Sequence, residues 1–163
     1  MPKRPVDKKP AVIIIDDDPF FARPIQQALK NFLNIDAEIF EDTTSAIGGM
    51  IRLEKEGKTI KAIICDTNLE PEKRLPTDAG EMRRWHNRPP NMNGPEFAAK
   101  LKSPLFRART GINSSPYFIL TSMMHIDASR EPDINKFICQ DEDDYIDKIV
   151  DSVDKALNGR SRS

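Results

Sequence analysis

The stretch IIIDDDP at residues 13–19 is the most informative feature of the sequence. An apolar run that starts at residue 11 ends abruptly in three carboxylates, and a proline follows them. Asp18 and Pro19 are the residue types that favour the N-cap and the first turn of a helix. The stretch therefore predicts a buried strand at 11–15 that passes directly into a helix.

A second apolar run, at residues 60–65, also ends in a carboxylate, that of Asp66. Ligands of open parallel sheets bind at the carboxyl ends of the strands. If the two strands are neighbours, Asp16, Asp17 and Asp66 converge on one pocket. Such a pocket would bind a hard cation and hold one carboxylate ready to act as a nucleophile. The alternative is that these acids serve only as helix caps.

Apolar strand-like runs alternate with helical stripes along the rest of the chain. We predict further strands at 37–40, 117–120 and 137–139. Thr43, Thr44 or Ser45 is expected to cap a second helix, and further helices are expected from near Pro95 and from Tyr145. Pro24 is expected to kink the first helix or to shift its first turn. This alternation favours a parallel sheet with helices on both faces.

The composition indicates one small domain in a chain of 163 residues. The formal net charge of -1 predicts no affinity for nucleic acid. The longest purely apolar run, 11–15, is far shorter than a membrane span, and no secretory signal is present. Cys65 and Cys139 lie in expected strands and are predicted to be core thiols, so a cytoplasmic location is expected.

These motifs, in this order, resemble the receiver domain of two-component response regulators. The resemblance covers about residues 11–158 and depends on the segments 13–19, 63–66, 91–94 and 118–122 and on the amphipathic last helix. It implies a flavodoxin-like, doubly wound fold, with a five-stranded parallel sheet in the order 2-1-3-4-5 and helices on both faces. Residues 1–10 are then a flexible basic tail and 159–163 a short polar tail.

The resemblance also implies a role for each acid. Asp66 matches the phosphoacceptor. Asp16 and Asp17 match the acid pair that holds Mg²⁺ together with Asp66, and the backbone carbonyl of Asn68 completes the metal site. These residue types suit the chemistry, because Mg²⁺ prefers oxygen ligands and a carboxylate can attack a phosphoryl group.

Two further positions match groups that respond to phosphorylation in the family. Thr121 matches the switch hydroxyl that moves toward the phosphoryl group, and the alternative is a structural hydroxyl at the end of a strand. Phe137 lies where the family has an aromatic switch, and the alternative is plain core packing.

The family's conserved lysine has no counterpart in this chain. The matching position is Gln140, or Cys139 if the alignment shifts by one residue. A neutral donor such as Gln140 contributes about 0.5–1.5 kcal/mol, against about 1.5–3 kcal/mol for a charged one. Lys136 is an alternative cation that would have to reach the site from another direction.

A long insertion separates Asp66 from Gly94. Its extra residues, at about 70–90, carry Trp85 and an arginine cluster composed of Arg83, Arg84 and Arg88. Connections of this length are uncommon and are either functional or disordered. The insertion is therefore either a lid or docking arm whose arginines replace the missing lysine, or a solvated loop.

Three other features depart from the family pattern. They are a polar connection at 103–115, a short or irregular helix expected at 123–133, and His125, which is expected to be exposed at the surface.

The sequence thus predicts a stand-alone receiver that accepts a phosphoryl group on Asp66 from a histidine kinase or a histidine phosphotransfer protein. It is expected to act through contacts with an unknown downstream protein and not as a metabolic enzyme. Asn68 and the apolar Met123 would flank the attacking water, so self-dephosphorylation is expected to be slow. The alternative is a pseudo-receiver, a protein-binding module that works without phosphorylation because Gln140 replaces the lysine.

Overall fold

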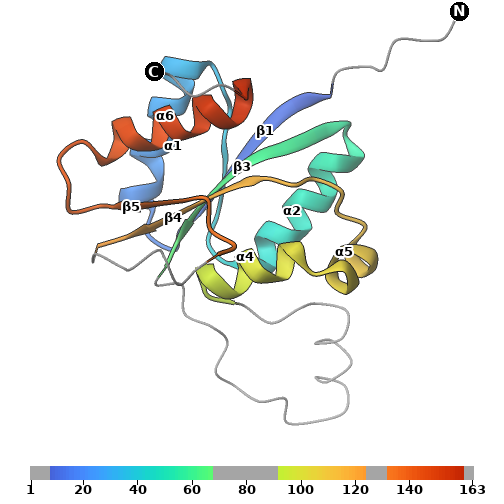
Figure 1. The fold of residues 1–163 in the computed structure, drawn as a ribbon. Helices are drawn as coiled ribbons and strands as arrows, with labels where there is room; N and C mark the ends of the chain where they lie inside the picture. Colours follow the sequence, from blue (N-terminus) through green and yellow to red (C-terminus); the bar gives the residue numbers. More distant parts are fainter. Residues whose placement is uncertain (1–7, 68–91, 124–131, 160–163) are drawn as a thin grey trace, which may run out of the picture.

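The computed structural model describes residues 8–67, 92–123 and 132–159. Within these ranges, five parallel strands form one sheet in the order β2-β1-β3-β4-β5. Helices α1 and α6 lie on one face of the sheet, and α2, α4 and α5 lie on the other (Figure 1). This arrangement confirms the doubly wound, flavodoxin-like topology that the sequence predicts.

The strands are β1 (Lys9–Ile15), β2 (Glu38–Phe40), β3 (Lys58–Asp66), β4 (Tyr117–Ser122) and β5 (Lys136–Cys139). The helices are α1 (Pro19–Leu33), α2 (Thr43–Lys55), α4 (Gly94–Lys102), α5 (Pro104–Thr110) and α6 (Tyr145–Asn158). None of these helices combines the length and the apolar composition needed to span a membrane.

Strands β1 and β3 are buried on both faces over most of their length, which is why they form nearly continuous apolar runs. Alternate side chains of β1 enter opposite layers of the core. Ile13 packs in the layer under α2 and α4 with Phe97, whereas Ile14 packs in the layer under α1 and α6 with Leu29 and Ile149. Because strand side chains alternate, one run of isoleucines supplies both layers.

The β1 strand begins two residues earlier than the apolar run. Lys9 and Pro10 pair with Lys58 and Thr59 of β3, so the strand extends into residues that sequence reasoning assigns to the tail. Backbone pairing does not require apolar side chains, and the exposed Lys9 therefore left no hydrophobic signal.

Helix α1 begins as predicted. The Asp18 carboxylate accepts a hydrogen bond from the backbone N–H of Phe20 at 2.9 Å, and Pro19 occupies the first turn. The helix continues through Pro24 and its first turn is not shifted, so the expected shift is wrong, whereas the kink that was the alternative stays a prediction. Pro24 has no N–H to donate, so one intrahelical hydrogen bond is missing there.

Helix α2 is capped by Asp42, one residue before the predicted candidates. The Asp42 carboxylate accepts from the backbone N–H of Ser45 at 2.7 Å. The hydroxyl of the buried Thr43 instead accepts from the backbone N–H of Met92 at 2.7 Å. Thr43 therefore anchors the chain just before α4 to the start of α2.

Helix α5 occupies part of the polar connection expected at 103–115, so the absence of an element there is a wrong prediction. Ser103 caps the helix, Pro104 opens it, and Gly111 ends it at a φ of 75°. These three residues are standard helix start and stop signals. Helix α5 contains no buried residue. It therefore shows no apolar stripe, and the sequence pattern did not predict it.

Candidate functional site

Three carboxylates meet at the carboxyl edge of the sheet. Strands β1 and β3 are neighbours and pair Ile15 with Cys65, so the acids at their carboxyl ends come together. One carboxylate oxygen each from Asp16, Asp17 and Asp66 lie within 4.8 Å of one another. The sequence predicted this cluster only on the condition that the two strands are neighbours. The structure meets that condition.

The members of this cluster differ in their exposure to solvent. Asp16 is 4% exposed, Asp66 is partly buried and Asp17 is exposed. The pKa of Asp16 is raised to about 7, mainly by burial and also by the negative charges of Asp66, Asp17 and Asp18, while a hydrogen bond from the backbone N–H of Asp18 acts in the opposite direction. The folded chain therefore holds a carboxylate in a position where its negative charge is unfavourable.

This donor set fits Mg²⁺. Carboxylate oxygens are hard ligands, and Mg²⁺ commonly binds through a few of them while it keeps several waters. A divalent cation would also remove the repulsion that raises the pKa of Asp16. The remaining predicted ligand, the carbonyl of Asn68, lies outside the described residues.

Thr121 lies beside Asp66 in the pairing of β3 with β4. Its side chain is 1% exposed, and its hydroxyl donates to the carbonyl of Cys65 at 3.4 Å. Its own carbonyl accepts from both the backbone N–H and the hydroxyl of Thr67, each at 2.8 Å. Sequence reasoning missed Thr67, although a hydroxyl residue directly after Asp66 was a usable signal.

Gln140 lies at the same edge of the sheet. Its side-chain amide donates to the Thr121 hydroxyl at 3.3 Å, and its backbone N–H donates to the carbonyl of Ser122 at 2.7 Å. The side chain is 8% exposed. Lys136, the alternative cation, is an exposed residue at the opposite end of β5, where it pairs with Ile119.

The other predicted residues surround this edge in different ways. Phe137 is partly buried and packs against the core layer under α2 and α4, as the core-packing alternative expects. Met123, directly after β4, is 48% exposed. The arginine cluster, Trp85 and His125 lie outside the described residues.

Gly94, at the start of α4, approaches the end of β3 closely. A Cβ atom at Gly94 would lie 2.5 Å from Cδ1 of Leu120 and 3.1 Å from the carbonyl oxygen of Asp66. Only glycine leaves room for this contact between the helix and the end of β3.

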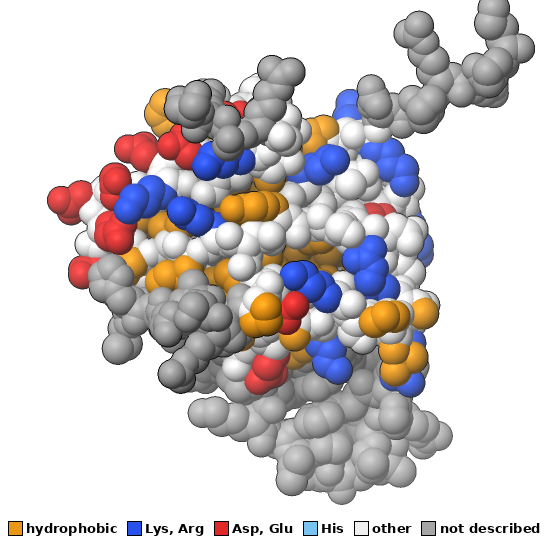
Figure 2. Space-filling model, in the orientation of Figure 1, with side chains coloured by type: hydrophobic (Ala, Val, Ile, Leu, Met, Phe, Trp, Pro, Cys, Tyr) orange, Lys and Arg blue, Asp and Glu red, His pale blue; other side chains and the backbone are white. Residues whose placement is uncertain are grey.

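The turn that follows Gln140 adds further negative charge. Figure 2 shows acidic side chains gathered at the edge of the molecule where β5 passes into α6. The residues of this turn are Asp141, Glu142, Asp143 and Asp144. The turn follows the carboxyl end of β5, so this edge of the sheet would attract cations and basic partners.

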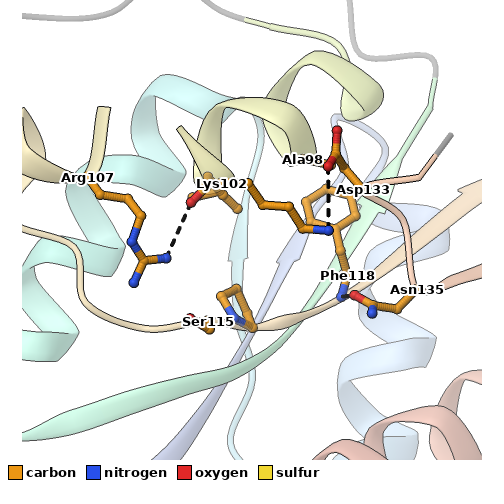
Figure 3. A pocket seen from close by; sticks show the side chains of 9 residues that line it. Ala98, Lys102, Arg107, Ser115, Phe118, Asp133 and Asn135 are labelled. Atoms are coloured by element: carbon orange, nitrogen blue, oxygen red, sulfur yellow. Dashed lines mark hydrogen bonds and ion pairs between the residues drawn. The ribbon is translucent and has the colours of Figure 1, made fainter. Parts of the chain in front are cut away.

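A hollow of about 240 Å³ lies elsewhere, near the amino ends of β4 and β5. Figure 3 shows Lys102 and Asp133 forming an ion pair across it, with Arg107 nearby. The Arg107 guanidinium donates to the carbonyls of Leu101 and Ser114 within this region. The hollow shares no residue with the acidic cluster, and its cations are already engaged.

Neither a protein-family model nor a curated protein matches the sequence. Solved structures do match the fold. The signal receiver domain of an HD domain-containing protein from Pseudomonas fluorescens Pf-5 superposes with a TM-score of 0.58 at 15% identity, over 93% of this chain and 97% of that one. This chain has the receiver-domain fold.

Two other structures support the assignment of the receiver fold. A response regulator receiver domain protein (CheY-like) from Methanospirillum hungatei JF-1 has a TM-score of 0.55 at 15% identity, over 93% of this chain and 99% of that one. The signal receiver domain of a putative Luxo repressor protein from Vibrio parahaemolyticus has a TM-score of 0.56 at 17% identity, over 93% of this chain and 92% of that one. At these identities the likeness concerns the fold alone.

Proposed function

We propose that this protein acts in two-component signalling, binds Mg²⁺ at Asp16, Asp17 and Asp66, and accepts a phosphoryl group on Asp66. The donor would be a histidine kinase or a histidine phosphotransfer protein. The observation that carries the proposal is the convergence of the three carboxylates at the carboxyl edge of a receiver fold. Thr121, in register beside Asp66, supplies a hydroxyl at the same place.

The proposed reaction moves one phosphoryl group from nitrogen to oxygen. A carboxylate oxygen of Asp66 forms a bond to phosphorus while the bond between phosphorus and the donor's imidazole nitrogen breaks. The imidazole keeps the electron pair and takes a proton from solvent, and Asp66 becomes an acyl phosphate. Bound Mg²⁺ supplies charge neutralisation for the phosphoryl oxygens in such transfers.

Phosphorylation would change the electrostatics of this edge of the sheet. A phosphoryl group adds about 1.5 to 2 negative charges at neutral pH. The edge already carries Asp16, Asp17 and the acidic turn after β5, so a reordering of nearby segments would follow. The output would pass to a downstream protein through surface contacts. Met123 offers no hydrogen bond to orient an attacking water, so the phosphoryl group is expected to be lost slowly.

The test is phosphorylation by a small donor. The purified protein is incubated with Mg²⁺ and acetyl phosphate, and its intact mass is recorded beside Asp66→Ala and Asp141→Asn variants. A single phosphoryl adduct is expected in the wild type and in Asp141→Asn, whose substitution lies on the exposed acidic turn. An adduct that persists in Asp66→Ala, or no adduct in the folded wild type, would overturn the proposal.

A second candidate is the pseudo-receiver, a binding module that works without phosphorylation. It is favoured by Gln140, which stands where the receiver lysine is expected and contacts Thr121 instead of supplying a positive charge. A folded wild-type protein that takes no phosphoryl adduct in the presence of Mg²⁺ would favour this candidate.

A further inference from the structure

We infer that Gln140 is a positioning residue that holds the Thr121 hydroxyl on the carbonyl of Cys65 and so opposes its movement toward a group bound on Asp66. This inference deepens the proposed function, because it concerns the regulation of the same site. Three arguments support it, each drawn from hydrogen bonds among the described residues.

The first argument is the hydrogen-bonding capacity of a hydroxyl. A threonine hydroxyl has one proton to donate and two lone pairs that accept. In Thr121 the proton points to the carbonyl of Cys65, and the Gln140 amide donates to the hydroxyl oxygen. To bind a phosphoryl oxygen on Asp66, the hydroxyl would have to donate to it. The contact with Cys65 must therefore break first.

The second argument is that only the Thr121 side chain can make this movement. Its carbonyl accepts two hydrogen bonds from Thr67, and its strand is paired on both sides. The hydroxyl oxygen can then change its position only by rotation about χ1, which in a β-branched residue has few favourable values. The Gln140 amide opposes this rotation, because a rotated hydroxyl would leave a buried donor without its partner.

The third argument is the way Gln140 is held. Its backbone N–H donates to the carbonyl of Ser122, and the preceding Cys139 thiol donates to the carbonyl of Met123 at 3.7 Å. The end of β5 is thereby tied to the end of β4. The amide is also neutral, so it lacks the strong attraction to a phosphoryl group that a lysine would have. Gln140 therefore stays with Thr121 when Asp66 is charged.

The first test measures Thr121 before any phosphorylation. Carbon-13 methyl NMR of threonine reports the χ1 populations of Thr121 in the wild type, in Gln140→Met and in Ser152→Ala, a buried control on α6. A single rotamer is expected in the wild type and the control, and averaging between rotamers in Gln140→Met. Unchanged χ1 populations in Gln140→Met would overturn the inference. Because no phosphoryl donor is present, this outcome is independent of whether the proposed function holds.

The second test adds Mg²⁺ and beryllofluoride, a mimic of the acyl phosphate. The fraction of Thr121 in the shifted position is expected to be roughly 2 to 10 times greater in Gln140→Met than in the wild type, the range of one neutral hydrogen bond. An equal response in both proteins would contradict the inference. If neither protein binds beryllofluoride, the proposed function fails. The χ1 populations of Thr121 from the first test then still decide the role of Gln140.

The third test measures the contact between Gln140 and Thr121 on the Gln140 amide. It does not use Gln140→Met and therefore remains valid if that variant folds poorly. The side-chain amide signals of Gln140 are compared in the wild type, Thr121→Ser and Thr121→Val. The serine retains a hydroxyl and should preserve the amide shift, whereas the valine should change it. Identical amide shifts in all three proteins would show that Thr121 does not hold Gln140.

Discussion

Asp66 and Thr121 lie opposite each other at the carboxyl ends of β3 and β4, and Thr67 fastens this pairing with two hydrogen bonds to the Thr121 carbonyl. Thr67 therefore links the end of β3, where the proposed phosphoacceptor lies, to the residue proposed to respond to it. The cluster of Asp16, Asp17 and Asp66 should make this edge of the sheet sensitive to pH and to cations. Helix α4 approaches the end of β3 so closely at Gly94 that almost no free space remains.

Without Mg²⁺, Asp16 should make the protein less stable as the pH rises from about 4 to 7. The pKa of Asp16 is raised to about 7 in the folded protein, mainly by burial, whereas the unfolded chain releases this proton near the ordinary value of 3.8. Between these values the folded state binds more protons, so the free energy of unfolding falls with rising pH and then levels off. The expected loss is on the order of 2–4 kcal/mol.

The measurement is urea unfolding at pH 4 and pH 8 in the presence of a chelator, for the wild type and Asp16→Asn. The asparagine retains an oxygen for the N–H of Asp18 but carries no titrating proton. Its stability should exceed that of the wild type at pH 8 and approach it at pH 4. A difference between the two proteins that does not vary with pH would contradict the prediction.

Mg²⁺ should stabilise the folded protein through the carboxylates. At a concentration about 100 times the dissociation constant, a ligand that binds only the folded state adds about 2.7 kcal/mol. For a chain of this size that corresponds to an increase in Tm of roughly 5–10 °C. Thermal unfolding should show the increase in the wild type and a much smaller one in Asp17→Asn. An exposed control, Asp151→Asn on α6, should retain the full effect.

Replacing Gly94 by alanine should destabilise the protein by about 1–3 kcal/mol, the usual cost of overpacking a filled core. The new methyl group would meet the side chain of Leu120 and the carbonyl of Asp66. Gly48→Ala is the matched control, because a Cβ there meets no atom within 4 Å, and the exchange should stabilise α2 by up to about 1 kcal/mol.

Chemical denaturation gives both changes in stability. Phosphorylation of Asp66 should also slow in Gly94→Ala and stay unchanged in Gly48→Ala, because only the first substitution disturbs the end of β3. Equal stabilities for the two variants would contradict the assigned close contact.

Glu54 should stabilise the fold when it is charged, which is the opposite of the effect expected of Asp16. Its carboxylate accepts from the backbone N–H groups of Asn113 and Ser114 and from the Ser114 hydroxyl, and it thus joins α2 to the chain before β4. Burial alone would raise the pKa of Glu54, but these hydrogen bonds lower it on balance. The stabilisation is therefore present above the ordinary value of 4.5 and is lost as the pH falls through the lowered pKa.

Glu54→Gln should cost about 1–3 kcal/mol at pH 7, and little at a pH where Glu54 is protonated. Glu56→Gln is the control, since Glu56 forms ion pairs with Arg52 and Lys58 only at the surface. Unfolding curves at pH 7 and pH 3 provide the comparison. A large loss in Glu56→Gln, or none in Glu54→Gln, would show that the role of Glu54 is misassigned.

Much of the fold could be predicted from local patterns. The isoleucine runs of β1 and β3 and the stripe of α6 predicted elements that the structure confirms, because burial on one or both faces imposes a period on the sequence. Helix α5 was missed for the opposite reason. It has no fully buried residue: Phe106 packs only partly against the core, and Arg107 donates to backbone carbonyls of the segment that follows the helix.

Most strands and helices, and the acids at the strand ends, can be predicted from the sequence, since these depend on side-chain type and spacing along the chain. The adjacency of Asp16 and Asp66 at the ends of neighbouring strands, and the hydrogen bond from Gln140 to Thr121, follow from the three-dimensional structure alone. Those contacts join residues far apart in the sequence. Their geometry comes from sheet pairing and from the satisfaction of buried polar groups, which no local pattern records.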